Sequence, residues 1–85
     1  MPLYEVRLSR VAAEKISGLD EVPRERVMEF LKHLEETATP LGQGRLWRIR
    51  GHFGYVAADI GGMRVLYHID WEQRRVEILD VIEEF

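Results

Sequence analysis

Two runs of alternating apolar and polar residues, Tyr55–Ile60 and Met63–Asp70, are joined by Gly61-Gly62. Gly-Gly between such runs is typical of a two-residue hairpin, because both glycines tolerate the positive φ angles of a type I′ turn. The turn also fixes which residues are opposite each other. The pattern therefore predicts an antiparallel hairpin with these facing pairs: Ile60 with Met63, Asp59 with Arg64, Ala57 with Leu66, and Tyr55 with His68.

Helical spacing of apolar residues dominates the first half of the chain. Alternation over Leu3–Leu8 predicts a strand, and Ser9 then provides a side-chain N-cap for a helix that Gly18 helps to end. Pro23 fits the first turn of a second helix, which Thr39-Pro40-Leu41-Gly42 stops. The apolar stripe predicted for the second helix consists of Val27, Phe30, Leu31, Leu34 and Ala38.

A last strand is predicted over Arg75–Ile82, whereas Leu46–Arg50 fits either an extended lead-in or a further strand. A four-residue turn at Trp71–Arg74 would place Asp70 opposite Arg75, His68 opposite Glu77, and Leu66 opposite Leu79. The order is thus one strand, a two-helix hairpin and an antiparallel meander. This order predicts one α+β domain over residues 1–85, with both helices on one face of the sheet.

Composition excludes several function classes. The formal charge of −3 lacks the basic excess of most nucleic-acid-binding domains, and the absence of cysteine excludes disulfides and thiolate chemistry. No apolar run is long enough for a membrane span, and the N-terminus lacks the features of a signal peptide. We therefore expect a cytoplasmic protein. Scattered histidines and the lack of paired carboxylates predict no metal site and no cofactor.

The order of elements, together with three short motifs, resembles the RelE/ParE toxin superfamily. The motifs are Tyr4-x-Val6-x-Leu8-Ser9, Ile49-Arg50-Gly51, and Gly61-x-x-Arg64-Val65-x-Tyr67. The resemblance spans nearly the whole chain. It implies the toxin of a type II toxin–antitoxin pair, silenced by a cognate antitoxin. Its RelE-like branch cleaves mRNA on the ribosome, and its ParE-like branch poisons DNA gyrase.

The resemblance carries over to individual residues only in part. Arg64 matches the arginine that RelE-like toxins place against the scissile phosphate. The basic residues of the preceding strand align with Ala57 and Asp59 here, and the chain ends in Ile82-Glu83-Glu84-Phe85 without the usual basic or histidine residue and tyrosine. Ribonuclease activity does not follow from the fold for this reason.

The face of the sheet away from the helices carries the candidate catalytic residues. Cleavage through the 2′-hydroxyl needs positive charge on the phosphate and two proton-transfer groups. Arg64 would supply the charge, and His68 and Tyr55 the proton transfer. Each has a structural alternative. Arg64 would pair with Asp59 and His68 with Glu77 across the strands, and Tyr55 would be a packing or rim residue.

Two further surfaces are candidate binding sites. Basic residues could contact RNA backbone or simply blunt an edge strand: Arg45, Arg48, Arg50 and His52. Apolar residues on the outward face would bind a partner, such as an antitoxin or a second copy of the chain: Leu66, Leu79, Val81 and Phe85.

Two hypotheses follow. The first is a RelE-like, metal-independent mRNA endonuclease acting at the ribosome. The second is a non-enzymatic binding module on the same fold, either a ParE-like gyrase toxin or a degenerate toxin. The missing basic residues and the acidic tail favour the second hypothesis.

Overall fold

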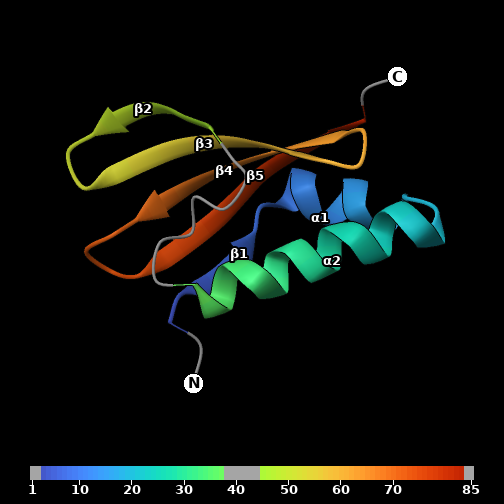
Figure 1. Cartoon of the computed structure of the whole chain (residues 1–85), viewed down its shortest axis with the longest axis horizontal. Helices are drawn as coiled ribbons and strands as arrows, with labels where there is room; N and C mark the ends of the chain where they lie inside the picture. Colours follow the sequence, from blue (N-terminus) through green and yellow to red (C-terminus); the bar gives the residue numbers. More distant parts are fainter. Residues whose placement is uncertain (1–2, 38–44, 84–85) are drawn as a thin grey trace.

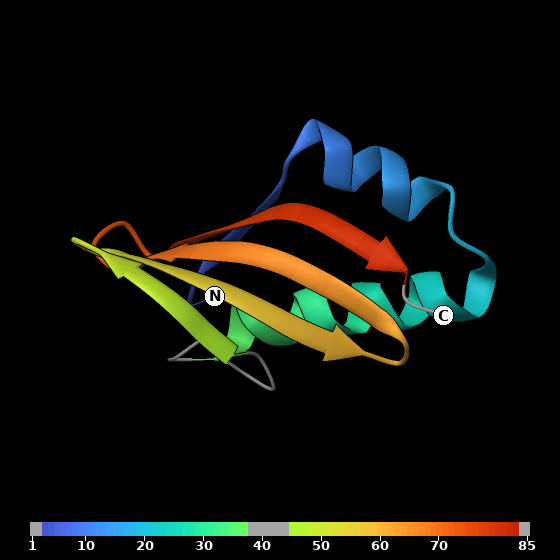
Figure 2. The ribbon, with the colours of Figure 1, turned by 90° about the horizontal axis from the view of Figure 1, so that it is seen from above.

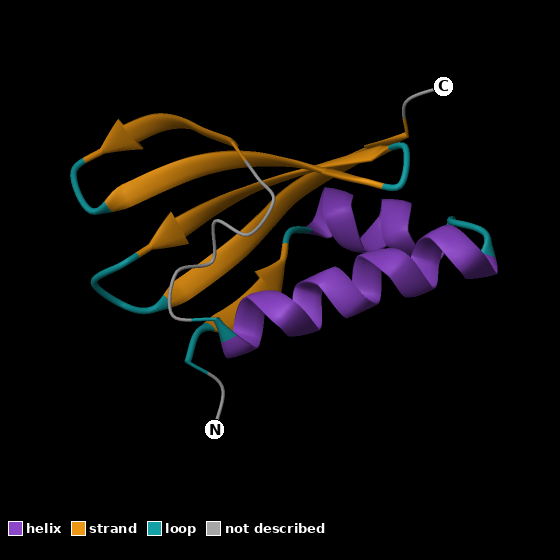
Figure 3. Cartoon of the chain, in the orientation of Figure 1, coloured by secondary structure: helices purple, strands orange, loops and turns teal. Residues whose placement is uncertain are grey.

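One mixed β-sheet, covered by helices on a single face, accounts for the described part of the chain (Figure 1). The computed structural model describes residues 3–37 and 45–83, with the backbone alone at Trp47 and Arg48. Its elements are β1 (Glu5–Leu8), α1 (Arg10–Ser17), α2 (Glu21–Glu36), β2 (Arg45–Arg50), β3 (Phe53–Ile60), β4 (Met63–Asp70) and β5 (Arg75–Glu83). The predicted α+β class, with both helices on one face, is confirmed (Figure 3).

The ends of the helices follow the predicted signals. The Ser9 hydroxyl oxygen accepts a hydrogen bond from the Ala12 N–H at 3.0 Å and donates one to the Leu79 carbonyl at 2.8 Å. Gly18 closes α1, because its N–H donates to the carbonyls of the last helical turn. In α2 the buried residues are Val27, Phe30, Leu31 and Leu34, while Ala38 and the stop at 39–42 lie outside the described residues.

The Gly61-Gly62 turn has the predicted geometry. Both glycines have positive φ angles, 53° and 84°. The four predicted pairs between β3 and β4 are all present, including Asp59 opposite Arg64 and Tyr55 opposite His68. Since side chains alternate along a strand, this register puts the apolar set against the helices and the candidate site on the opposite face.

The register between β4 and β5 was predicted only in part. Asp70 lies opposite Arg75 and His68 opposite Glu77, as expected. The predicted pairing of Leu66 with Leu79 is wrong, because a bulge inserts one residue and places Asp80 opposite Leu66. Beyond the bulge every side chain of β5 changes face.

The two edges of the sheet are β1 and β2. The strand order is β1-β5-β4-β3-β2, with β1 parallel to β5 and the other neighbours antiparallel. The segment Leu46–Arg50, for which two alternatives were open, lies within strand β2. Figure 2 shows β2 at the margin of the sheet.

The core lies between the sheet and the helices. Its fully buried side chains include Leu34 and Val27 of α2 and Val65, Tyr67 and Ile69 of β4. Burial raises the pKa of the Tyr67 phenol, since the anion is not solvated there. No helix among the described residues is long and apolar enough to cross a membrane.

Candidate functional site

The sheet face opposite the helices, called the outer face here, presents the predicted catalytic residues. On β3 and β4, residues of the core alternate with partly exposed residues of this face. Both helices lie on the other side of the sheet. The outer face is therefore the surface on which the side chains of β2, β3 and β4 can meet a ligand.

A shallow hollow of about 500 Å³ lies on this face. It is lined by Arg45, Ala57, Asp59, Arg64 and Leu66. Arg45 comes from the edge strand β2, where its backbone pairs with Ala57. Two arginines from different strands thus border the position at which the resemblance implies a scissile phosphate.

Asp59 pairs with Arg64 in this hollow, as the sequence predicted. The Arg64 Nε donates to the Asp59 Oδ1 at 3.3 Å. The Asp59 side chain is 74% exposed and the Arg64 side chain 43%, so water and salt screen the pair and its contribution to stability is small. Its larger effect is electrostatic, because the carboxylate offsets the positive charge that Arg64 would offer to a phosphate.

His68 and Tyr55 form a second cluster, separate from the hollow. Their ring centroids lie 5.8 Å apart, and the His68 Nε2 is 3.9 Å from the Glu77 carboxylate. The His68 Nδ1 is buried without a hydrogen-bond partner. Neither residue lines the hollow, and four residues along β4 separate the Cα atoms of Arg64 and His68 by about 13 Å. The structure therefore brings Tyr55 and His68 together but not with Arg64.

The residues predicted to contact RNA do not share one environment. Arg45 and Arg50 are exposed on β2, and the backbone of Arg48 pairs with Tyr55. His52, in contrast, lies between two acids, with Nε2 3.7 Å from Asp70 and Nδ1 3.4 Å from Glu72. The imidazole of His52 thus ties the β2–β3 turn to the β4–β5 turn.

Phe53 lies in the same cluster as His68, although the sequence had not marked it as a candidate. Its ring centroid lies 4.2 Å from that of His52 and 5.7 Å from that of His68. It lies opposite Asp70, so extending the hairpin register by two residues beyond Tyr55 would have placed it on the outer face. The signal was present in the sequence but lay beyond the predicted start of the strand.

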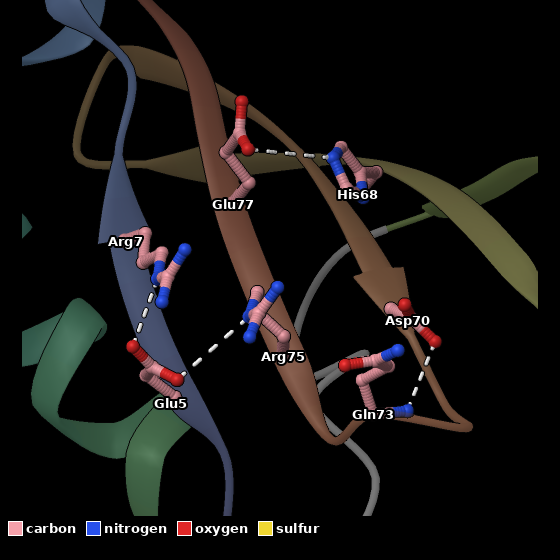
Figure 4. Close-up of polar contacts among 7 residues, drawn as sticks. All are labelled: Glu5, Arg7, His68, Asp70, Gln73, Arg75 and Glu77. Atoms are coloured by element: carbon pink, nitrogen blue, oxygen red, sulfur yellow. Dashed lines mark hydrogen bonds and ion pairs between the residues drawn. The ribbon is translucent and has the colours of Figure 1, made fainter.

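Charged pairs cover the other end of the outer face, across β1, β5 and β4 (Figure 4). Glu5 accepts from the Arg7 Nε at 2.8 Å and lies 3.7 Å from the Arg75 Nε. The hydrogen bond from Arg7 is the main cause of a lowered pKa for the Glu5 carboxyl. Asp70, which faces Arg75, accepts the backbone N–H of Glu72 and of Gln73 and so shapes the turn. On the β1 side of the outer face, these charged residues therefore form pairs across neighbouring strands and serve the fold.

The predicted partner-binding residues are not all on the surface. Leu66 and Leu79 are partly exposed. The placement of Val81 on the outer face is wrong, because the β5 bulge turns it into the core, where it is 3% exposed. Ile82, 38% exposed, takes the position opposite Arg64 instead. Phe85 lies outside the described residues.

The chain is similar to solved structures of RelE toxins and of their complexes with RelB. The toxin–antitoxin complex RelBE2 from Mycobacterium tuberculosis contains a chain 33% identical, with a TM-score of 0.78 over 99% of this chain and 100% of that one. The archaeal RelE–RelB complex from Pyrococcus horikoshii gives 21% identity and a TM-score of 0.86 over 95% and 94%.

The isolated RelE toxin of Escherichia coli is 19% identical, with a TM-score of 0.70 over 96% of this chain and 85% of that chain. At this identity, and at that of the archaeal complex, the likeness concerns the fold alone. No protein-family model matches the sequence, and no curated protein matches it either.

Proposed function

The chain belongs to the RelE/ParE superfamily of toxins, and from that premise we propose that it is a RelE-like endoribonuclease that cleaves mRNA at the ribosome and is silenced by a cognate antitoxin. The observation that carries the proposal is the hollow on the outer face. Arg64, the residue that matches the superfamily's phosphate-binding arginine, borders this hollow together with Arg45.

The antitoxin part of the proposal is supported by the solved relatives, several of which are complexes of RelE with RelB. The surface offers apolar side chains that a folded monomer would otherwise leave in water, among them Leu66, Leu79 and Ile82. A partner that covers these residues would also cover Arg64, because Ile82 and Leu66 flank it in the sheet. Binding and silencing would then be one event.

The catalytic part rests on charge. A phosphodiester attacked by its own 2′-hydroxyl gains negative charge on the phosphate oxygens, and arginines placed beforehand stabilise it. Arg64 and Arg45 are the residues we assign to this role. We assign no proton-transfer residue inside the hollow. Among the described residues that line it, Asp59 has the one ionisable side chain besides the two arginines.

A second function is favoured by a specific observation. Asp59 pairs with Arg64, and the neighbouring position on β3 is Ala57, so the basic strand of active RelE-like relatives is lost. A non-enzymatic toxin that binds DNA gyrase, or a degenerate toxin retained for its protein contacts, would need no such charge. Growth arrest without RNA cleavage would support this alternative.

Induced expression of the wild type and of Arg64→Ala tests the proposal. Growth is followed, and the 5′ ends of cellular mRNA are mapped. New 5′ ends in phase with codons, absent in Arg64→Ala, would support the nuclease. Arrest with intact mRNA in both strains would overturn it. Arg24→Ala, on the exposed face of α2, is the matched control because it removes the same charge far from the outer face.

A further inference from the structure

A bulge in β2 gathers arginines that the sequence alone places on different faces. Arg45 pairs with Ala57, while Arg48 pairs with Tyr55, because the register shifts between Leu46 and Arg48. In a regular strand, positions 45 and 48 would be on opposite faces. With the bulge, positions 45, 48 and 50 occupy successive outer-face positions along the free edge of the sheet.

A row of rings lies directly beside this edge. The centroids follow one another from His52 to Phe53 at 4.2 Å, from Phe53 to His68 at 5.7 Å, and from His68 to Tyr55 at 5.8 Å. These separations are typical of interacting aromatic pairs. None of the four rings belongs to the buried core, and Phe53, Tyr55 and His68 keep part of their surface exposed.

The two features are in register with each other. Arg50 pairs with Phe53 and Arg48 with Tyr55, so each ring of β3 has an arginine position beside it. At the far end of the same edge, Arg45 borders the hollow that contains Arg64. Rings and cations thus follow one line, which leads into the hollow.

We propose that this strip, defined as Arg45, Arg50, Phe53, Tyr55 and His68, binds single-stranded RNA and leads it to Arg64. Bases stack on the rings and phosphates lie against the arginines, a combination that serves single strands because every base has a flat face. This inference rests on the proposed function for its substrate class. It assigns Tyr55 and His68 to base stacking in place of proton transfer.

The acids of the region define where the strip ends. Asp70 and Glu72 lie against His52, and Glu77 lies 3.9 Å from the His68 Nε2. All three are on β4, β5 or the turn between them, whereas β2 carries no acid. A phosphate backbone is therefore favoured along β2 and the Phe53–Tyr55 part of β3 and repelled toward β5. Asp59 of β3 opposes it at the end of the strip beside Arg64. An acidic protein segment would share the attraction to arginine but would gain nothing from the row of rings.

The test measures binding separately from cleavage. The purified full-length chain is titrated against a fluorescein-labelled, 2′-O-methylated single-stranded RNA, which cannot be cleaved through its 2′-oxygen, and against the same sequence as a duplex. We expect preference for the single strand. Arg50→Glu should weaken binding about tenfold at low salt and lower the dependence of log K on log salt by about 0.7 per lost contact.

Phe53→Leu keeps an apolar side chain but removes the flat ring on which a base would stack, and should weaken binding about tenfold with the salt dependence unchanged. Arg24→Glu on α2 is the matched charge control and should have no effect. Thermal melts confirm that each variant is folded. If Arg50→Glu does not fold, Arg45→Glu provides a second charge reversal.

The outcomes separate this inference from the proposed function. If the wild type cleaves mRNA but Arg50→Glu and Phe53→Leu both bind RNA as well as Arg24→Glu does, the proposed strip is overturned and the nuclease proposal stands. Strip-dependent binding without cleavage by the wild type would keep the strip and overturn the nuclease. Absence of RNA binding, with loss of antitoxin co-purification in Arg50→Glu, would show that the strip serves an acidic protein partner and would overturn the inference.

Discussion

Asp59 is the residue whose replacement should change activity most informatively. It pairs with Arg64 across the strands at 3.3 Å and borders the hollow in which we place the scissile phosphate. If it acts only as a negative charge beside that phosphate, then removing the charge should raise cleavage, and reversing it should raise cleavage further. Asp59→Asn removes the charge with nearly constant shape, and Asp59→Lys reverses it with a longer side chain.

The size of the effect follows from Coulomb's law. Facing residues in a sheet lie about 5.5 Å apart, and we take this as the distance between the charge at position 59 and a phosphate held by Arg64. At the dielectric constant of water, the interaction of two unit charges at this distance is about 0.75 kcal/mol. Asp59→Asn should therefore raise the cleavage rate about threefold, and Asp59→Lys about tenfold. Loss of the exposed ion pair should lower stability by about 1 kcal/mol or less, so both variants should fold.

The assay is cleavage of a ribosome-bound mRNA by purified variants, measured at two salt concentrations. The gain should shrink at high salt, because screening weakens interactions between exposed charges. Glu25→Lys, at an exposed position of α2, applies the same charge reversal elsewhere. Reduced cleavage in Asp59→Asn would refute the reasoning, since it would mean that the carboxylate itself takes part or holds Arg64 in place.

Three further predictions concern stability. Burial raises the pKa of Tyr67 above the ordinary 10.0, so the unfolded chain releases a proton that the folded chain keeps, and stability falls as pH rises above about 10. Tyr67→Phe should reduce this alkaline loss in thermal melts. Ser9→Ala should lower the free energy of unfolding in urea by about 1 kcal/mol or more, because it removes the helix cap and the bond to β5. Gly51→Ala and Gly61→Ala should each lower it by about 1–2 kcal/mol, because both glycines have positive φ angles that alanine adopts only with strain. Equal stability to wild type would contradict this.

The hairpin was predictable because its signal is local. Gly61-Gly62 favours a tight two-residue turn with positive φ angles, and that turn fixes the register for the whole length of β3 and β4. The pairing of Asp59 with Arg64 and the neighbourhood of Tyr55 and His68 followed from this register alone. Helix ends at Ser9 and Gly18 were predictable for the same reason, since caps depend on neighbouring residues.

The bulges were not predictable from alternation. In β5 the extra residue moves Val81 from the expected outer face into the core, and in β2 it brings Arg45 onto the same face as Arg50. A bulge is selected by packing against the neighbouring strand, which a pattern within one strand does not report. The parallel pairing of β1 with β5 was likewise outside the sequence analysis, because it joins the two ends of the chain.

The candidate site was therefore predicted in part. The sequence identified Arg64 and its opposing carboxylate, but it grouped Arg64, His68 and Tyr55 as one catalytic set. Distance along β4 separates them, and the rings associate with Phe53 instead. Periodicity identifies residues that share a face, but not which of them are within reach of one another.

Cleavage of mRNA on purified bacterial ribosomes is the measurement that tests the central claim most directly. Wild type and Arg64→Ala are added to ribosomes programmed with a defined mRNA, and cleavage in the ribosome-bound codon is followed in time. We expect cleavage by the wild type and a rate at least about a hundredfold lower in Arg64→Ala, because the arginine stabilises the charged phosphate. Intact mRNA with the wild type, under conditions in which the same preparation arrests growth, would contradict the assignment of this toxin as a ribonuclease.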